Sequence, residues 1–398
     1  MRHLRPLSGI CAALLALTAP LQAQKKEKEP HRPKLDAALD TNDWQAYYQV
    51  GMSVVGPRPD KAVDYFYWAS RLNPARAEPL YARWAALWMT KKELLVEYRK
   101  GAEYVVNSGE SQHIDSLAQM AFRRNPFVHE GLERVLVAAM YDSRYGQGNW
   151  EWSANDENLA WLAYTERRFA AAAAQFGELL AKNPNRYYLH AQRASAFQGM
   201  HQYDSALTEL KALIDAMNKR DRKHLVAFYQ SRAQYWYSIG ILHQLMHDLP
   251  AAREAFGNAL TEDLSFYMAH GALGAVALAQ NDTTTALNEY GQAVQINGVD
   301  PVLRHDYGLI LLASRKYDEA APQLAKAIEL DPWFASTYMY LGSALDGQGK
   351  KSEALAQYSQ FLARAPRGMT KQMDMVKKRM AELGQASSGP TGENDDSR

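Results

Sequence analysis

The sequence contains a single cysteine, Cys11, which lies in an apolar stretch near the start of the chain. Because the rest of the chain has no thiol, disulfide bonds, thiolate nucleophiles and cysteine metal sites are excluded there. An excess of charge of one sign is also missing, since 45 basic and 44 acidic residues give a formal net charge of +1. This balance does not favour nucleic acid or an anionic membrane surface as a partner.

The common catalytic and nucleotide-binding motifs are missing as well. The chain has no G-x-S-x-G, no G-x-x-x-x-G-K-[ST], no G-x-G-x-x-G and no EF-hand loop. The neighbouring carboxylates Asp156 and Glu157 stand where a helix is expected to begin, a position that acidic residues favour. We therefore predict that the protein is not an enzyme and holds no cofactor.

One long apolar run is present, from Ile10 to Ala19. Arg2 and Arg5 precede it, and Leu21-Gln22-Ala23 follows with a small residue at a cleavage point, so residues 1–23 are predicted to be a secretory signal peptide. The run ends at Pro20 and is shorter than the roughly 20 residues that span a bilayer, which leaves a membrane anchor as the less favoured alternative. We expect an exported protein with no integral membrane segment after cleavage. The expected compartment is the periplasm, with an extracellular location as the alternative.

The composition predicts an all-α protein, because alanine is abundant, valine and isoleucine are sparse, and alternating runs joined by hairpin turns are missing. A 34-residue period runs through the C-terminal half. Glycine recurs at this interval at Gly240, Gly274, Gly308 and Gly342. Alanine recurs at Ala252, Ala286, Ala320 and Ala354, and four residues after each alanine stand Phe256, Tyr290, Leu324 and Tyr358.

The periodic glycines predict close contacts between helices. A glycine inside a helix lowers stability by roughly 0.5–1 kcal/mol relative to alanine. Its recurrence at one position of each period is therefore explained if two helices approach each other too closely there for a Cβ. The periodic alanine marks the opposing face of the second helix, and short turns such as Asn281-Asp282 separate the two helices. Each period is therefore predicted to be a helical hairpin.

This pattern resembles the tetratricopeptide repeat, which reads W-x2-L-G-x2-Y, then A-x3-F, then P. Trp236-x2-Ile239-Gly240-x2-His243 followed by Ala252-x3-Phe256 fits it, with Ile for Leu, His for Tyr and no final Pro. The resemblance implies an α-solenoid, a right-handed superhelix of stacked helical hairpins. The predicted segments are a disordered linker at 24–40, divergent repeats at 41–152, six repeats at 153–368 with a 12-residue insertion at 221–232, a capping helix at 369–384 and a disordered tail at 385–398. We expect the insertion to prolong the helix that contains Trp236.

His243 and His247 stand four residues apart, a spacing that lets two imidazoles on one helix share a zinc ion. The repeat frame places His243 on the tyrosine position of the first helix and His247 in the turn that follows. The helix is expected to end between them, and Gln244 stands where an H-E-x-x-H protease has its glutamate. We therefore predict no metal site here.

The resemblance implies that the first helix of each repeat lines a concave groove, mainly through repeat positions 2, 5, 9, 12 and 13. The candidate partner-binding residues at these positions are Trp161, Tyr164, Tyr188, Tyr237, Ile241, Gln244, His305, Leu309 and Met339. No repeat has the Lys and Asn pair by which some family members clamp the C-termini of chaperones. We predict a scaffold that binds a protein or peptide partner in this groove and supports assembly of an envelope complex.

Tryptophan is concentrated in the first part of the chain, where seven of nine precede residue 162. Such rings either fill gaps between divergent repeats or form an aromatic surface for a peptide or a glycan. The loop YDSRYGQGNWEWS, with Trp150 and Trp152, is the candidate aromatic surface. The alternative function is therefore binding of a glycan or of the cell wall.

Overall fold

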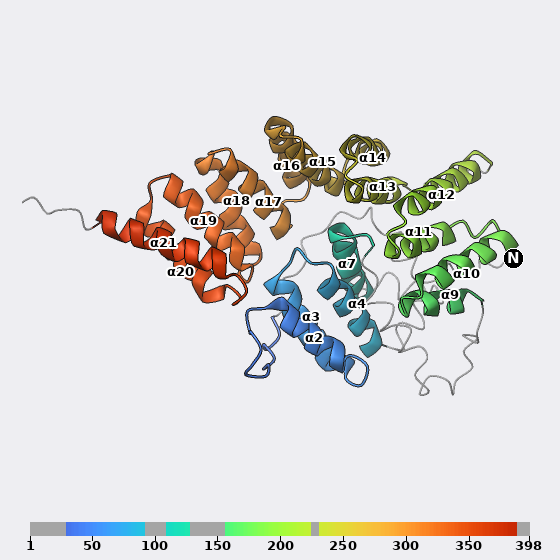
Figure 1. Ribbon diagram of the computed structural model, residues 1–398, viewed down its shortest axis with the longest axis horizontal. Coiled ribbons are helices and arrows are strands. Elements are labelled where there is room, and N and C mark those ends of the chain that lie inside the picture. The colour runs from blue at the N-terminus through green and yellow to red at the C-terminus, as the bar shows by residue number, and fades with distance from the viewer. Residues whose placement is uncertain (1–28, 92–108, 128–155, 224–230, 388–398) are drawn as a thin grey trace, which may run out of the picture. The chain divides into compact units, whose positions relative to one another are not determined.

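The computed structural model in Figure 1 describes residues 29–91, 109–127, 156–223 and 231–387. These residues form seventeen helices and no strand, which confirms the all-α prediction. The predicted signal peptide at 1–23, the loop with Trp150 and Trp152, and the tail from residue 388 lie outside the described residues. Among the described helices, none is long and apolar enough to cross a bilayer.

The chain divides into two compact units. The first contains Tyr47–Ser70 and Ala75–Val276 together with the segment before Leu35. The second contains Ala277–Arg398 together with Leu35–Ala46 and Arg71–Pro74.

Each of the six predicted repeats contains two helices separated by a short turn, and successive hairpins stack within each unit as an α-solenoid does. The helix pairs are α9 (Asp156–Thr165) and α10 (Phe169–Lys182), α11 (Leu189–Gly199) and α12 (Tyr203–Lys223), α13 (Ala233–Leu245) and α14 (Leu249–Glu262), α15 (Tyr267–Ala279) and α16 (Thr283–Ile296), α17 (Pro301–Ala313) and α18 (Tyr317–Leu330), and α19 (Ala335–Gly347) and α20 (Lys351–Arg364).

The periodic glycines lie at close contacts between the two helices of a hairpin, as predicted. A Cβ on Gly308 would lie 2.6 Å from Cγ of Leu324, and a Cβ on Gly342 would lie 2.6 Å from Cδ1 of Tyr358. Gly240 faces the ring of Phe256 in the same way. The glycine of the first helix and the bulky residue of the second therefore recur together because they occupy the same contact.

The N-terminal region begins with a hairpin that has the same contact. In α2 (Trp44–Val54) a Cβ on Gly51 would lie 2.6 Å from Cε1 of Phe66, which belongs to α3 (Pro59–Leu72). Two further helices, α4 (Glu78–Thr90) and α7 (Gly109–Arg124), pack against each other. The first hairpin supports the interpretation of this region as divergent repeats.

Each first helix of the six hairpins is followed by a residue in the left-handed backbone region, with φ between 57° and 76°: Arg167, His201, His247, Asn281, Arg315 and Gly349. After Arg315, the amide of Lys316 donates to the carbonyl of Leu311 at 2.9 Å, which closes the helix end in a Schellman motif. Glycine is the residue that this position favours, and in this set only Gly349 supplies it.

Replacing Arg315 by glycine is expected to stabilise the protein by about 0.5–1 kcal/mol. The left-handed conformation costs an L-residue about 1–2 kcal/mol, and glycine removes this cost. Glycine also has more conformational freedom in the unfolded chain, which offsets about half of the stabilisation. Urea unfolding followed by circular dichroism measures the change, and the reverse replacement Gly349→Arg is expected to destabilise by a similar amount. Shifts of the same sign in both variants would contradict this explanation.

The first residues of the insertion, 221–223, belong to the helix before it, and α13 begins at Ala233, directly after the insertion, so the prediction that the insertion prolongs the helix with Trp236 is wrong. Helix α13 has 13 residues, as do α15, α17 and α19, whereas α12 has 21 residues against 14 in the other second helices. Arg232, which is 2% exposed and immediately precedes α13, pairs with Asp221 of α12. Both neighbouring helices continue the same 3.6-residue pattern, so periodicity alone could not assign the insertion.

The predicted capping helix is present as α21 (Thr370–Ser387), which ends three residues after the predicted boundary at 384. Val376 and Leu383 are buried against the last repeat, while Lys377 and Lys378 are exposed. Val376 stands 34 residues after Gly342. A side chain is tolerated there because α21 is the last helix of the described chain and no second helix packs on it.

Residues 29–40 make specific contacts, in contrast to the disordered linker that the sequence predicts at 24–40. Arg32 donates from Nε to the hydroxyl of Tyr47 at 3.0 Å, and its guanidinium lies 4.8 Å from the centre of the Trp68 ring. In the second unit, the carboxylate of Asp40 accepts a hydrogen bond from the amide of Arg367. The charged, proline-containing composition predicts a segment without a core of its own, but it does not reveal contacts with distant repeats.

Candidate functional site

The nine predicted groove residues lie on first helices of the hairpins, except Tyr188, which immediately precedes α11. Six of them belong to the first unit, and the other three, His305, Leu309 and Met339, belong to the second. Their exposure differs. Tyr164, Tyr237, His305 and Met339 are at most 7% exposed, so they contribute mainly to the core. Five are half-buried and retain surface for a partner: Trp161, Tyr188, Ile241, Gln244 and Leu309.

In the first two repeats, Glu157 of α9 binds the predicted residue Tyr188. The hydroxyl of Tyr188 donates to Oε2 of Glu157 at 3.1 Å, and Nη1 of Arg186 lies 3.3 Å from the same oxygen. Burial raises the pKa of Glu157, against the opposing effects of Tyr188 and Arg186. Trp161, one turn further along α9, packs edge-on against Phe176 with ring centres 5.4 Å apart. The sequence did not single out Arg186.

In the third repeat, Tyr237 is enclosed by rings from α14, from the loop before α15, and from α7. The ring centres of Phe256 and Phe266 lie 5.6 and 5.7 Å from that of Tyr237, and Phe122 of α7 lies 6.4 Å away. Its hydroxyl donates to the carbonyl of Arg123 at 3.2 Å, and burial raises the pKa of Tyr237 above its ordinary range. Part of the predicted face is thus covered by the chain's own N-terminal region, which sequence reasoning missed.

In the fifth repeat, His305 is a buried, neutral histidine. Its Nδ1 lies 2.9 Å from Oγ1 of Thr337 on α19, and its ring lies 4.5 Å from that of Phe334 and 5.5 Å from that of Tyr340. Burial lowers the pKa of His305 to about 4. The site is therefore a joint between consecutive first helices rather than an open binding surface.

Acidification is expected to destabilise the second unit through His305. Above pH 6.5 the histidine is neutral in both the folded and the unfolded chain, so its burial does not lower the free energy of unfolding. As the pH falls from 6.5 to about 4, the unfolded chain binds a proton that the folded chain excludes, and about 3 kcal/mol is lost. Urea unfolding measured between pH 7 and pH 4 should show this loss, and His305→Gln should flatten the slope. An unchanged slope in that variant would assign the acid sensitivity to other groups.

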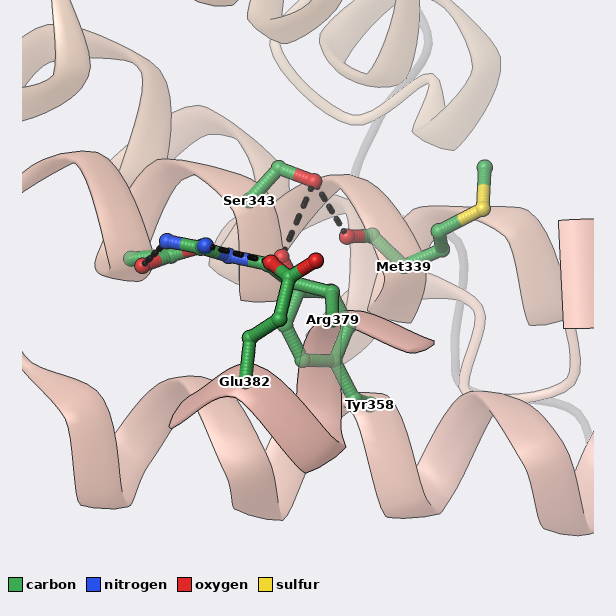
Figure 2. Close-up of polar contacts among 6 residues, drawn as sticks. Met339, Ser343, Tyr358, Arg379 and Glu382 are labelled. Carbon is green, nitrogen blue, oxygen red and sulfur yellow. Dashed lines mark hydrogen bonds and ion pairs between the residues drawn. The ribbon is translucent and has the colours of Figure 1, made fainter. Parts of the chain in front are cut away.

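In the sixth repeat, the predicted positions are engaged by neighbouring side chains (Figure 2). The hydroxyl of Ser343 donates to the carbonyl of Met339 at 3.1 Å and accepts from the hydroxyl of Tyr358 at 3.3 Å. Arg379 of α21 binds Asp346 through two bonds of 2.7 and 3.0 Å and Glu382 through one of 2.8 Å. The capping helix therefore covers this end of the first-helix face.

The two histidines with zinc-like spacing do not share a helix. Helix α13 ends at Leu245, and His247 follows in the left-handed region with φ of 59°. This confirms that the helix ends between them. Nδ1 of His243 instead lies 3.6 Å from the carboxylate of Asp248. Over the part of the chain that the structure describes, no three His, Cys, Asp or Glu side chains gather as metal ligands.

Three of the N-terminal tryptophans fill the core. Trp68, Trp84 and Trp88 are 2%, 5% and 0% exposed, and Nε1 of Trp84 donates to Oδ1 of Asp115 at 3.4 Å. These rings offer no surface to a glycan. Trp150 and Trp152, the candidate aromatic loop, lie outside the described residues.

Comparison with known sequences identifies part of the chain. The sequence profile of the tetratricopeptide repeat matches residues 237–301 and 306–368, as the spacing predicted. A small glutamine-rich tetratricopeptide repeat-containing protein 2 from Saccharomyces cerevisiae is 30% identical over 89 residues, and one from Mycosarcoma maydis is 30% identical over 97 residues. The matches cover 22% and 24% of this chain and 26% and 28% of those proteins, so the chain spans about a quarter of their length.

Several solved structures are similar at low identity. YrrB, described as a tetratricopeptide repeat protein with an unusual peptide-binding site, is 19% identical with a TM-score of 0.41 and covers 51% of this chain and 97% of its own. The C-terminal part of a repeat protein from Cytophaga hutchinsonii is 16% identical with a TM-score of 0.44 and covers 60% of this chain and 96% of its own. MamA is 18% identical with a TM-score of 0.38, covering 45% and 91%.

Proposed function

We propose that this chain, whose residues 237–301 and 306–368 match tetratricopeptide repeats, is an exported scaffold without catalytic activity. It binds a protein or peptide partner on the first helices of its repeats and supports assembly of an envelope complex. Stacked repeats present long continuous surfaces, and such surfaces commonly bind extended segments of other proteins.

The observation that supports this proposal most directly is an accessible aliphatic stripe on first helices of the second unit. Leu278 of α15 is 37% exposed, and Leu312 of α17, which stands 34 residues later, is half-buried. Leu309, one turn before Leu312, is half-buried as well. A single exposed leucine is ordinary, but aliphatic side chains that recur at the same position of consecutive repeats are suited to an apolar partner segment that follows the repeats.

Capture from an envelope extract tests the proposal. Wild-type protein is immobilised beside the variant Leu278→Asp/Leu309→Asp, and bound proteins are identified by mass spectrometry. The matched control is Leu264→Asp, because Leu264 is 78% exposed and follows a second helix. We expect the control to retain the partners of the wild type and the double variant to lose them. Equal capture by all three proteins, or retention on purified cell wall without a protein partner, would overturn the proposal.

Export is tested separately. Cells producing the full chain are fractionated, and the N-terminus of the purified protein is sequenced. We expect a periplasmic protein that begins near residue 24, where the predicted signal peptide ends. An intact Met1 or recovery with the cytosol would refute export while leaving the capture experiment valid.

A further inference from the structure

The end of α7 lies against first helices of repeats that follow it by more than a hundred residues. Within the first unit, Ala121–Phe127, with the sequence AFRRNPF, contacts Tyr237 of α13 and Tyr267 of α15. Figure 1 shows α7 beside the first helices α11 and α13. In a solenoid each repeat packs on its neighbours, so a contact that reaches past two intervening repeats is not ordinary stacking.

Arg123 makes the polar part of this contact. Its Nη1 donates to the hydroxyl of Tyr267 at 2.7 Å, and its guanidinium lies 5.0 Å from the centre of the same ring. Its carbonyl accepts from the hydroxyl of Tyr237. Two tyrosines from consecutive repeats therefore bind the main chain and the side chain of one residue, as a peptide-binding face does.

Two phenylalanines make the apolar part. Phe122 is 6% exposed and its ring lies tilted against that of Tyr237, with ring centres 6.4 Å apart. Phe127 is 7% exposed in a core cluster with Ala194 of α11 and Ile239 of α13. Between them, Oδ1 of Asn125 accepts from the amide of Phe127 at 2.9 Å and turns the chain. The segment thus presents an aromatic and an arginine side by side, followed by a second aromatic after a turn.

We propose that residues 122–127 are an internal ligand that closes the first-helix face of α11, α13 and α15, and that the partner of this face is a protein segment in which a phenylalanine is followed by an arginine. Such a segment displaces residues 122–127 because it makes the same contacts with Tyr237 and Tyr267. This inference rests on the proposed function, since it describes how one part of the binding surface is regulated and what it recognises.

A peptide of the chain's own residues 119–128, labelled at its N-terminus, tests the internal ligand. Fluorescence anisotropy measures its binding to the full-length protein. The wild type should bind it weakly because the face is occupied. The variant Arg123→Ala loses a charge-assisted bond and a cation–π contact, so it should bind the peptide about tenfold more tightly. Adding Tyr267→Ala to that variant should abolish the gain.

Matched controls separate displacement from general loosening. Arg76, whose side chain bonds with the nearby Glu78, lies in the same unit, and Arg76→Ala should bind the peptide as weakly as the wild type does. If Arg123→Ala proves poorly folded by circular dichroism, Phe122→Leu provides a milder alternative, which keeps an apolar side chain and should give a smaller increase in affinity. A folded variant of either kind that binds the peptide no more tightly than the wild type overturns the internal ligand. That result would leave partner capture through Leu278 and Leu309 unaffected, so the two proposals fail separately.

Discussion

Gly308→Leu is expected to lower the free energy of unfolding by about 3 kcal/mol or more. A Cβ at this position would lie 2.6 Å from Cγ and 2.7 Å from Cδ2 of Leu324, and Leu324 is fully buried. The leucine side chain adds three further carbons to that Cβ, so α17 and α18 must separate, and overpacking of this kind costs about 1–3 kcal/mol and sometimes more. Because each repeat is stabilised by its neighbours, the damage should spread and broaden the thermal transition.

Two comparisons isolate the contact in urea unfolding followed by circular dichroism. Lys326→Ala, which removes an exposed i,i+3 ion pair with Glu329, should stay within about 0.5 kcal/mol of the wild type. Leu324→Ala should make Gly308→Ala nearly neutral or stabilising, because the new methyl group occupies the space that Leu324 vacates. If the wild type, Gly308→Leu and Lys326→Ala unfold at the same urea concentration, Gly308 is not a packing site.

The hairpins could be predicted because their defining contact is local. The glycine and the bulky residue that meet in Gly240–Phe256, Gly308–Leu324 and Gly342–Tyr358 are sixteen residues apart and recur in phase. The left-handed residues that close the first helices follow the same period, interrupted once by the insertion. When a contact lies within one repeat, the residues that make it recur in every repeat, so their spacing alone reveals the contact.

Exposure of the candidate groove residues could not be predicted in the same way. Tyr237 and Leu309 stand on equivalent faces of first helices, yet Tyr237 is 5% exposed because α7 covers it, whereas Leu309 is only half-buried. The contact between Arg123 and Tyr267 joins residues 144 apart and occurs once. A single long-range contact has no period, so the sequence pattern does not indicate it.

The polar contacts of the capping helix were likewise not predictable from the sequence pattern. The capping helix was predicted from the sequence, and its charged residues Lys371, Lys377 and Lys378 are exposed. Arg379 of the same helix nevertheless forms a two-bond ion pair with Asp346 of α19, 33 residues earlier. Helical periodicity separates an apolar face from a polar one, but it does not identify which polar side chain finds a partner.

The other large effect is expected at the insertion, where Asp221→Ala should cost about 3–5 kcal/mol. The guanidinium of Arg232 is 2% exposed and pairs with the carboxylate of Asp221, which joins α12 to the start of α13. Removing the carboxylate breaks an ion pair to a guanidinium that stays buried, which is the costly way to disrupt such a pair. Burial opposes ionisation of Asp221, but bonds from Arg232 and Arg220 outweigh it and lower its pKa. The contribution of this ion pair to the free energy of unfolding should therefore be complete above pH 4 and should decline as the pH falls below 4.

A double replacement distinguishes the buried charge from simple loss of contact. In Asp221→Leu/Arg232→Met both charges are gone, so most of the lost stability should return, because an apolar pair of similar volume carries no desolvation cost. Arg220→Ala removes the more exposed cation, which is 31% exposed, and should cost no more than about 1 kcal/mol. Urea unfolding of the four proteins at pH 7 gives the comparison. If the double variant is no more stable than Asp221→Ala, then the ion pair does more than neutralise Arg232, and its geometry itself sets the spacing between α12 and α13.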